Sequence, residues 1–302
     1  MRAIDELREI SAALRGCDIK EFSREAESII TSCTGVGRVA IYRDNPVLSD
    51  MEQEAVMRAL KRRMRKEPLQ YILGHVEFYG LKIKVGQGVL IPRPESELIV
   101  EEVIRAVKSR RSIAESGNFP GVSRLSDPGA SGNWMPKILD LCTGSGCLAL
   151  AVGREFGDSR VSAVDFSEKT LDYARENAEA NGIKNVIFLK GDLFDPVKEE
   201  RFDIIVSNPP YIKRASIISL SPEIREWEPL EALDGGEDGL EFYRRILSCA
   251  AEHLDEHGFL IFELGYGAAR EVGEIAKKSG FRPVSVIKDY SGIERVLSLV
   301  LS

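Results

Sequence analysis

A primary amide and an aromatic ring stand together in the tetrapeptide Asn208-Pro209-Pro210-Tyr211, which directly follows the apolar run at residues 202–207. The Asn side chain offers a neutral hydrogen-bond acceptor for an NH2 group. A Pro carbonyl accepts a second bond without a competing N–H, and a Tyr face stacks on flat groups. These properties suit methylation of a planar, weakly nucleophilic nitrogen in an amide or a nucleobase. A Pro-rich turn after a strand is the plainer alternative that the motif leaves open.

A second group of polar residues and glycines lies upstream, between a predicted strand and a predicted helix. Its members are Asp140, Cys142, Thr143, Gly144, Ser145 and Gly146. Glycines let a backbone approach a ligand closely, and open α/β sheets bind ligands at the carboxyl ends of their strands. Asp165 ends the next predicted strand about 20 residues later, where an acidic side chain can hold both ribose hydroxyls. Together these features predict a site for a nucleotide-containing cofactor.

The type of cofactor depends on the residues around the glycines. Residues 144–149 also fit a dinucleotide pattern, so a nicotinamide-dependent oxidoreductase is a rival interpretation. Asp140 favours S-adenosylmethionine, because a carboxylate there suits a sulfonium and an amino group but repels a diphosphate. Asp192 and Leu193 follow the third predicted strand, where they would meet the edge and face of an adenine. Asp140 as a turn cap and Asp192 in a solvated loop are the plainer alternatives. We predict a methyltransferase that uses S-adenosylmethionine.

The elements that must position these motifs alternate between strands and helices. Ser167 is the predicted N-cap of the helix after the second strand. The strands are near-continuous apolar runs, predicted at residues 137–141, 160–165, 186–189, 202–207 and 259–264. Two more strands, near residues 283–287 and 295–301, have no long helix between them and predict a final antiparallel hairpin. The predicted fold class is α/β, a doubly wound, mostly parallel, Rossmann-like sheet.

The chain before this sheet has a different pattern, in which apolar residues recur at helical spacing. We predict a small helical substrate-docking domain over residues 1–76 and a β-hairpin linker over 77–97 with its turn at 86–88. The methyltransferase domain covers residues 98–302. Within it, residues 109–133 are rich in Ser, Gly, Arg and Asn without periodicity, which predicts a flexible insertion.

Composition excludes several classes of function. The net charge of −7 over 302 residues disfavours stable binding of nucleic acid. The five cysteines are scattered, and the three histidines lie far from most of these cysteines, so we expect no metal site and no disulfide framework. No apolar run approaches about 18 residues and the N-terminus does not resemble a signal peptide, which predicts a cytoplasmic protein without a membrane segment.

Further segments resemble the HemK/PrmC-type protein-(glutamine-N5) methyltransferases over nearly the whole chain. They are residues 68–74 with Phe78, 89–97, 228–236 and 288–295. Cys142 stands where many members of that family have Gly, and Ser96 replaces a more usual Thr. The resemblance implies methylation of the glutamine in the Gly-Gly-Gln loop of peptide chain release factors, with S-adenosylmethionine as the cofactor. We expect a monomer whose partner is the release factor.

The resemblance also implies roles for single residues. The implied cofactor site consists of Cys142, Thr143, Gly144, Ser145, Gly146, Asp165, Phe166, Asp192, Leu193 and Asn208. Asn208 and Pro209 would hold the target amide, with Pro210 and Tyr211 packed beside it. Arg93 and Glu95 would shape the mouth of the substrate site or form an ion pair that anchors the hairpin. Methylation of an exocyclic amine in RNA or DNA is the nearest rival, because enzymes of that class use similar motifs.

Overall fold

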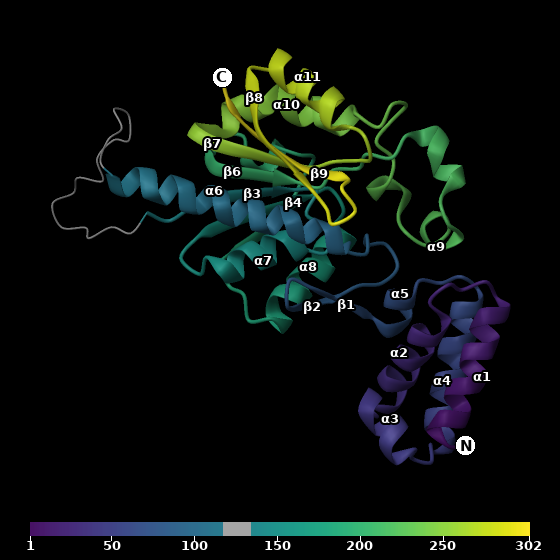
Figure 1. The fold of residues 1–302 in the computed structure, drawn as a ribbon. Helices are drawn as coiled ribbons and strands as arrows, with labels where there is room; N and C mark the ends of the chain where they lie inside the picture. Colours follow the sequence, from purple (N-terminus) through teal and green to yellow (C-terminus); the bar gives the residue numbers. More distant parts are fainter. Residues whose placement is uncertain (117–133) are drawn as a thin grey trace. The chain divides into compact units, whose positions relative to one another are not determined.

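The computed structural model describes residues 1–116 and 134–302. The chain divides into two compact units (Figure 1). The helical unit contains Met1–Val76, Val85–Gln87 and Leu220–Glu228, and the sheet unit contains Glu77–Lys84, Gly88–Ser219 and Pro229–Ser302. A short segment from late in the chain, Leu220–Glu228, therefore belongs with the first helices, which no sequence pattern predicted.

The helical unit is built from amphipathic helices packed around a shared apolar core. Ile10, Leu14, Ile29 and Ile30 are fully buried in it, because helical spacing puts them on the inner faces. Ser49 caps α4 in a capping box with Glu52. The helices are α1 (Ala3–Gly16), α2 (Phe22–Thr34), α3 (Arg38–Asp44), α4 (Asp50–Met64), α5 (Leu69–Leu73) and the short α9 (Pro222–Arg225).

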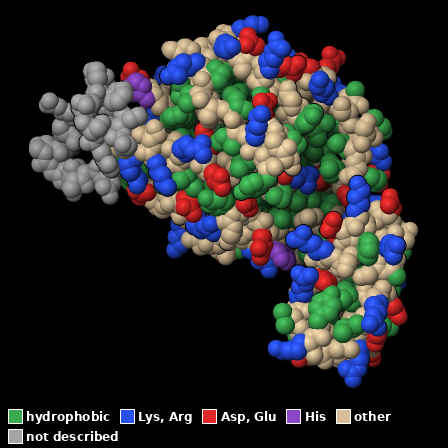
Figure 2. All heavy atoms as spheres, viewed as in Figure 1, with side chains coloured by type: hydrophobic (Ala, Val, Ile, Leu, Met, Phe, Trp, Pro, Cys, Tyr) green, Lys and Arg blue, Asp and Glu red, His purple; other side chains and the backbone are tan. Residues whose placement is uncertain are grey.

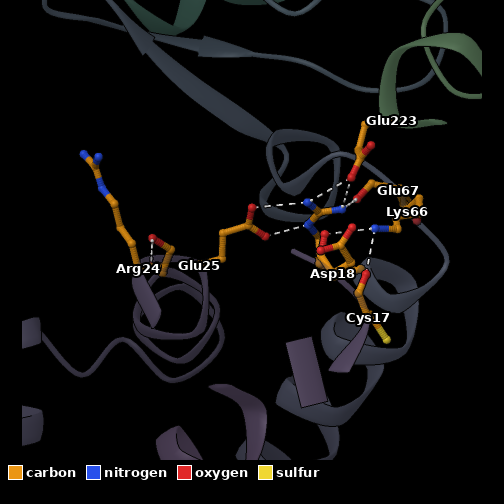
Figure 3. A network of polar contacts seen from close by, with 9 residues as sticks. Cys17, Asp18, Arg24, Glu25, Lys66, Glu67 and Glu223 are labelled. Atoms are coloured by element: carbon orange, nitrogen blue, oxygen red, sulfur yellow. Dashed lines mark hydrogen bonds and ion pairs between the residues drawn. The ribbon is translucent and has the colours of Figure 1, made fainter. Parts of the chain in front are cut away.

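A buried arginine joins three helices of this unit. The Arg63 side chain, at the end of α4, is 6% exposed, and its Nε lies 2.5 Å from Glu25 Oε2 of α2. Its Nη1 lies 3.3 Å from Glu223 Oε1 of α9. Figure 3 shows Glu25 and Glu223 directed toward the same point from two sides. One buried guanidinium thus pairs with two carboxylates, and the pair with Glu223 fastens α9 to the helical unit.

The hairpin lies earlier in the chain than its sequence pattern predicted. Strands β1 (His75–Phe78) and β2 (Leu81–Lys84) form a two-stranded sheet. Tyr79 and Gly80 form the turn with φ of 47° and 69°, a pair of left-handed conformations typical of a tight two-residue hairpin. The predicted turn at residues 86–88 is wrong, because the aromatic side chain of Tyr79 is typical of a strand, whereas its backbone has the left-handed conformation of the turn.

The sheet unit contains a seven-stranded sheet with order β5-β4-β3-β6-β7-β9-β8. Strands β3 to β7 are parallel, and β8 and β9 form an antiparallel hairpin at one edge, which confirms the predicted fold class. The strands are β3 (Lys137–Leu141), β4 (Arg160–Asp165), β5 (Val186–Lys190), β6 (Phe202–Ser207), β7 (Leu254–Glu263), β8 (Phe281–Lys288) and β9 (Glu294–Leu301). Strands β3 and β6 are buried along nearly their whole length, as their apolar runs require.

Helices cover both faces of this sheet (Figure 1). One face carries α6 (Glu97–Ser116), α7 (Cys147–Glu155) and α8 (Glu168–Ala180), and the other carries α10 (Glu241–His253) and α11 (Ala269–Lys278). Since α6 runs to Ser116, the predicted start of an irregular insertion at residue 109 is wrong; residues 117–133 of that insertion lie outside the described residues. In the described parts of the chain, no helix is long and apolar enough to cross a membrane.

Candidate active site

Strand order brings the two predicted motifs side by side. From β3 the chain moves outward to β4 and β5 and then returns to β6, on the other side of β3, so β3 and β6 flank a topological switch point. Leu141 is in register with Ser207, and the Ser207 hydroxyl donates to the Leu141 carbonyl oxygen at 2.8 Å. Cys142 and Asn208 therefore leave the sheet next to each other. This edge is where an open α/β sheet binds its ligands.

The glycine turn after β3 combines an open position with a tightly packed one. Gly146 is the N-cap of α7, and a Cβ there would lie 3.0 Å from Ala174 Cβ, so its missing side chain permits close contact with α8. Gly144 has no neighbour within 4 Å of the place where a Cβ would be. The buried Asn177 amide of α8 donates to the Ser145 carbonyl at 3.0 Å and to the Lys84 carbonyl at 3.1 Å. Asn177, which sequence reasoning missed, therefore holds the turn against β2.

Asp140 is fully buried beneath this turn. Its Oδ2 accepts from the Thr143 hydroxyl at 2.5 Å and from the Ala149 N–H, in the first turn of α7, at 3.2 Å. In the described part of the chain its Oδ1 has no hydrogen-bond partner. Burial raises the pKa of Asp140 to about 7, against the effect of those two donors. This burial favours the turn-capping alternative over an open carboxylate facing a ligand.

Cys142 has a conformation that suits glycine better than cysteine. Its φ of 60° lies in the left-handed region, where a Cβ is strained. Burial raises the pKa of its thiol well above the usual range, so the group stays protonated at neutral pH. The backbone shape of the turn is thus the one that a Gly at this position would adopt without strain.

Asp165 lies at the end of β4, beside the glycine turn. Its Oδ2 accepts from the Gly144 N–H at 2.9 Å and its Oδ1 from the Ser167 N–H at 3.0 Å. A carboxylate can accept about four hydrogen bonds, so Asp165 keeps capacity for a further donor beside its backbone N–H partners. Burial raises the pKa of Asp165, although these backbone donors oppose the shift. The adjacent Phe166 is 56% exposed, which leaves an aromatic face open next to the carboxylate.

The segment after β5 reaches the same edge of the sheet. Leu193 is buried with φ of 50°. Asp192 is exposed, and its Oδ2 lies 2.6 Å from Arg245 Nη2 of α10. The structure therefore puts Asp192 in a solvated ion pair, the plainer of the two interpretations. Its role at an adenine edge stays a prediction.

Gly235 packs against the backbone of the Asn208–Tyr211 motif at a distance that only a glycine permits. A Cβ on Gly235 would lie 2.7 Å from Tyr211 Cα. The Gly235 N–H also donates to the Ile212 carbonyl at 2.9 Å. Pro209 and Pro210 are buried, whereas Asn208 and Tyr211 are half-buried. Asn208 and Tyr211 thus remain partly exposed at the sheet edge, and the two buried prolines between them anchor the segment.

Glu263, at the end of β7, was missed by sequence reasoning. It is 1% exposed, and its two carboxylate oxygens accept from the Ser96 hydroxyl at 2.5 Å and the Tyr211 hydroxyl at 3.1 Å. Ser96 Oγ in turn lies 3.5 Å from Asn208 Nδ2. Burial raises the pKa of Glu263 to about 7, and the two hydroxyl donors oppose this. One signal was present: Glu263 is the single charged residue in the otherwise apolar run at residues 259–264, close to its carboxyl end.

The segment before α6 reaches this network as well. Arg295 of β9 has its Nη2 3.6 Å from Glu95 Oε1 and its Nε 2.8 Å from Asp289 Oδ2. This favours the anchoring interpretation for Glu95. Arg93 lies close enough for its charge to lower the pKa of Tyr211, while burial and the Glu263 carboxylate raise it further than Arg93 lowers it.

The edge as a whole fits a nucleoside better than a metal. Asp165 presents acceptors for hydroxyl groups, Phe166 presents an aromatic face, and Gly144 borders open space. No cluster of three or more His, Cys, Asp or Glu suited to a metal ion occurs in residues 1–116 and 134–302.

Comparisons with known proteins agree with this geometry. The family described as PrmC N-terminal domain matches residues 5–74, and the family described as Methyltransferase small domain matches residues 124–220. A release factor glutamine methyltransferase from Thermodesulfovibrio yellowstonii is 44% identical over 302 residues, 99% of this chain and 98% of the relative. One from Geobacter sulfurreducens is 39% identical over 274 residues, 90% of this chain and 87% of the relative. A methyltransferase structure from Pyrococcus furiosus shares the fold, with a TM-score of 0.50 and 22% identity over 74% of this chain and 90% of that one.

Proposed function

Because the chain belongs to the family of release factor glutamine methyltransferases, we propose that it methylates the side-chain amide nitrogen of the glutamine in the Gly-Gly-Gln loop of peptide chain release factors. The methyl donor in this proposal is S-adenosylmethionine. The observation that carries the proposal is the register of β3 with β6, which sets Asn208 beside the glycine turn. The proposal includes a cytoplasmic location, where release factors act.

Residues at the sheet edge suit the proposed donor. Asp165 would accept from the ribose hydroxyls, and Phe166 and Leu193 would contact the adenine. Gly144 would allow the rest of the molecule to approach the backbone. When bound, S-adenosylmethionine supplies a methyl group on a sulfonium, which becomes a neutral thioether once the methyl has left.

Asn208 is the central residue for the acceptor nitrogen. Its Oδ1 would accept one hydrogen bond from the glutamine NH2, and the Pro209 carbonyl would accept the other. A glutamine nitrogen is weakly nucleophilic because its lone pair is delocalised into the carbonyl. Two acceptors would hold it in line with the methyl group and favour the positive charge that develops on nitrogen. The new N–C bond forms as the S–C bond breaks, and the nitrogen loses one proton to water.

Transfer of a radiolabelled methyl group tests which molecule is the substrate. The protein is incubated with labelled S-adenosylmethionine and a release factor, with the Gln→Ala variant of the Gly-Gly-Gln loop, or with bulk tRNA and rRNA. We expect label in the unaltered release factor alone. Label in RNA and none in the release factor would show that the target is a nucleobase.

The same assay tests the neutral acceptor at position 208. We expect Asn208→Ala to lose about 100-fold or more in kcat, a loss comparable to removing an oriented donor from an oxyanion site. Asn208→Asp should also lose activity, because a carboxylate is not a neutral acceptor. Full activity of Asn208→Asp with a changed pH profile would show that the residue acts as a base instead.

Surface charge does not favour a nucleic-acid substrate. Figure 2 shows Lys and Arg side chains interspersed with Asp and Glu on the visible face, without one basic stripe. The net charge of −7 points the same way, since phosphate backbones are held by clustered positive charge.

A further inference from the structure

We propose that Glu263 is a positioning residue for this reaction: acting through the Ser96 hydroxyl, it orients the Asn208 amide so that Oδ1 faces the target nitrogen. The inference rests on the proposed function, in which Asn208 accepts a hydrogen bond from the glutamine NH2. Three strand ends supply the geometry, because Ser207 is in register with both Leu141 and Phe262. Glu263, the last residue of β7, therefore lies beside Asn208, which follows β6.

The hydrogen bonds at Glu263 have one direction when its carboxyl group is ionised. An ionised carboxylate accepts hydrogen bonds and donates none. Ser96 Oγ lies 2.5 Å from Oε2 and the Tyr211 hydroxyl lies 3.1 Å from Oε1, so both hydroxyls must donate to Glu263. The Tyr243 hydroxyl donates to the Glu263 backbone carbonyl at 2.7 Å, which fixes the end of the strand. An ionised Glu263 thus sets the direction of the Ser96 and Tyr211 O–H groups.

The Ser96 hydroxyl determines how the Asn208 amide is oriented. A serine hydroxyl has one proton, and Ser96 uses it to donate a hydrogen bond to Glu263. The Ser96 oxygen can therefore only accept a hydrogen bond from any other group. The Asn208 amide at 3.5 Å must therefore turn its Nδ2 toward Ser96. The two ends of an Asn amide have nearly the same shape, so packing alone selects neither orientation. Hydrogen-bond polarity makes the selection and leaves Oδ1 for the substrate.

Protonation of Glu263 changes these hydrogen bonds. A protonated Glu263 carries a proton of its own, so the Ser96 hydroxyl can accept from Glu263 and donate to Asn208 instead. Asn208 then loses its fixed orientation. The pKa of about 7 makes this change measurable near neutral pH. Other charged or titratable groups near Glu263 are Glu95, Cys147, Tyr211, Tyr243 and Arg295, with Asp289 paired to Arg295. Asp140 also has a pKa of about 7, so a variant of Glu263 is needed to assign the titration.

A second buried glutamate provides a matched control. Glu102 of α6 is 4% exposed, and its Oε1 accepts from the hydroxyls of Ser285 at 2.8 Å and Ser298 at 2.5 Å. Its Oε2 forms an ion pair with Arg105. Glu102 thus resembles Glu263 in burial and hydroxyl partners but does not contact the motif after β6.

The experiment compares Glu263→Gln, Ser96→Ala, Ser96→Thr and Glu102→Gln with the unaltered protein. Measurements are kcat and KM for the release factor from about pH 6 to 9, and Kd for S-adenosylmethionine by calorimetry. We expect Glu263→Gln and Ser96→Ala to lower kcat about tenfold, the scale of one lost hydrogen bond, with KM and Kd within about threefold. The unaltered protein should gain activity as the pH rises through about 7, and Glu263→Gln should lack this rise.

The two remaining variants separate positioning from general structure. Ser96→Thr keeps the hydroxyl and should retain kcat within about threefold, and Glu102→Gln should match the unaltered protein in kcat and pH profile. The proposal is overturned if Glu263→Gln keeps both kcat and the rise near pH 7. It is also overturned if Glu102→Gln lowers kcat as much as Glu263→Gln does.

A substrate-free measurement keeps this result distinct from failure of the proposed function. If the unaltered protein labels no release factor, the proposed function fails. The orientation of Asn208 is then read from the NMR signals of its side-chain NH2. We expect these signals to shift as the pH passes about 7, and to lose that shift in Glu263→Gln. Signals that titrate identically in both proteins would refute the link between Glu263 and Asn208.

Discussion

Each unit of the molecule buries a charged side chain, and the surroundings of the two differ. Arg63 in the helical unit lies between the carboxylates of Glu25 and Glu223. Glu263 in the sheet unit accepts hydrogen bonds from the hydroxyls of Ser96 and Tyr211. The first charge is balanced by opposite charges at contact distance, and the second is solvated by dipoles.

This difference separates a structural role from a functional one. Removing one partner of a buried ion pair costs stability because the other charge is left uncompensated. A carboxylate buried among neutral partners has its pKa raised by burial, which the hydrogen bonds only partly offset, and its ionisation lowers stability. Shifted groups of this second kind concentrate at functional sites. Glu263 lies at the ligand-binding edge of the sheet, whereas Arg63 lies within a helix bundle.

The largest expected effect is on stability when Arg63 is replaced by Met. This change leaves Glu25 and Glu223 without their cation, and we expect the free energy of unfolding to fall by about 3 kcal/mol. Urea denaturation followed by circular dichroism measures it. Arg58→Met is the control, because Arg58 is 68% exposed and its pair with Glu54 lies at the surface, where a loss below about 1 kcal/mol is expected. Equal losses of unfolding free energy in the two variants would show that the buried Arg63 contributes no more to stability than the exposed Arg58.

The next effect concerns the pH dependence of stability at Glu263. Its pKa rises from 4.5 in the unfolded chain to about 7 in the native state, so the native state holds the proton more tightly. The resulting stabilisation, about 3 kcal/mol as an order of magnitude, is complete below about pH 4.5 and is lost as the pH rises through about 7. Glu263→Gln removes this contribution.

Urea denaturation at about pH 5 and pH 8.5 measures this difference. We expect the unaltered protein to lose more free energy of unfolding between the two pH values than Glu263→Gln does. Asp140 titrates in the same direction, but it is present in both proteins and cancels in the comparison. The same loss in both would mean that Glu263 is ionised throughout this range.

The smallest effect compares backbone strain in the two units. Asn45 at the end of α3 has φ of 42°, and asparagine tolerates this region. Cys142 has φ of 60° with a less tolerant side chain. Cys142→Gly relieves that strain but adds conformational entropy to the unfolded chain. The strain energy should exceed the entropic cost, so we expect the free energy of unfolding to rise by about 0.5 kcal/mol.

Cys147→Gly is the matched control for that prediction. Cys147 is a buried residue in the first turn of α7 and is not among the residues with positive φ, so glycine should destabilise the protein there by about 1 kcal/mol. Thermal unfolding of both variants gives the two signs. Destabilisation by Cys142→Gly would show that packing of its side chain outweighs the strain.

Much of the sheet could be predicted from periodicity. Residues 137–141, 160–165 and 202–207 are strands with the predicted bounds, and Ser167 caps α8 through the Thr170 N–H. These predictions succeed because buried parallel strands need continuous apolar runs and helix starts need side-chain acceptors. The predicted position of the hairpin turn was wrong because the φ values of Tyr79 and Gly80 depend on the pairing of both strands.

The sequence by itself determined which chemical groups are available: the amide and ring of Asn208-Pro209-Pro210-Tyr211, the glycine turn and Asp165. It also determined that they follow strands, since hydrophobic periodicity is a local property. Tertiary structure alone decided that Glu263 lies beside Asn208 and that Leu220–Glu228 joins the helical unit. Strand order and long-range ion pairs have no local signature, because they join residues far apart in the chain. The surroundings that set the pKa of Glu263 exist only in the folded protein.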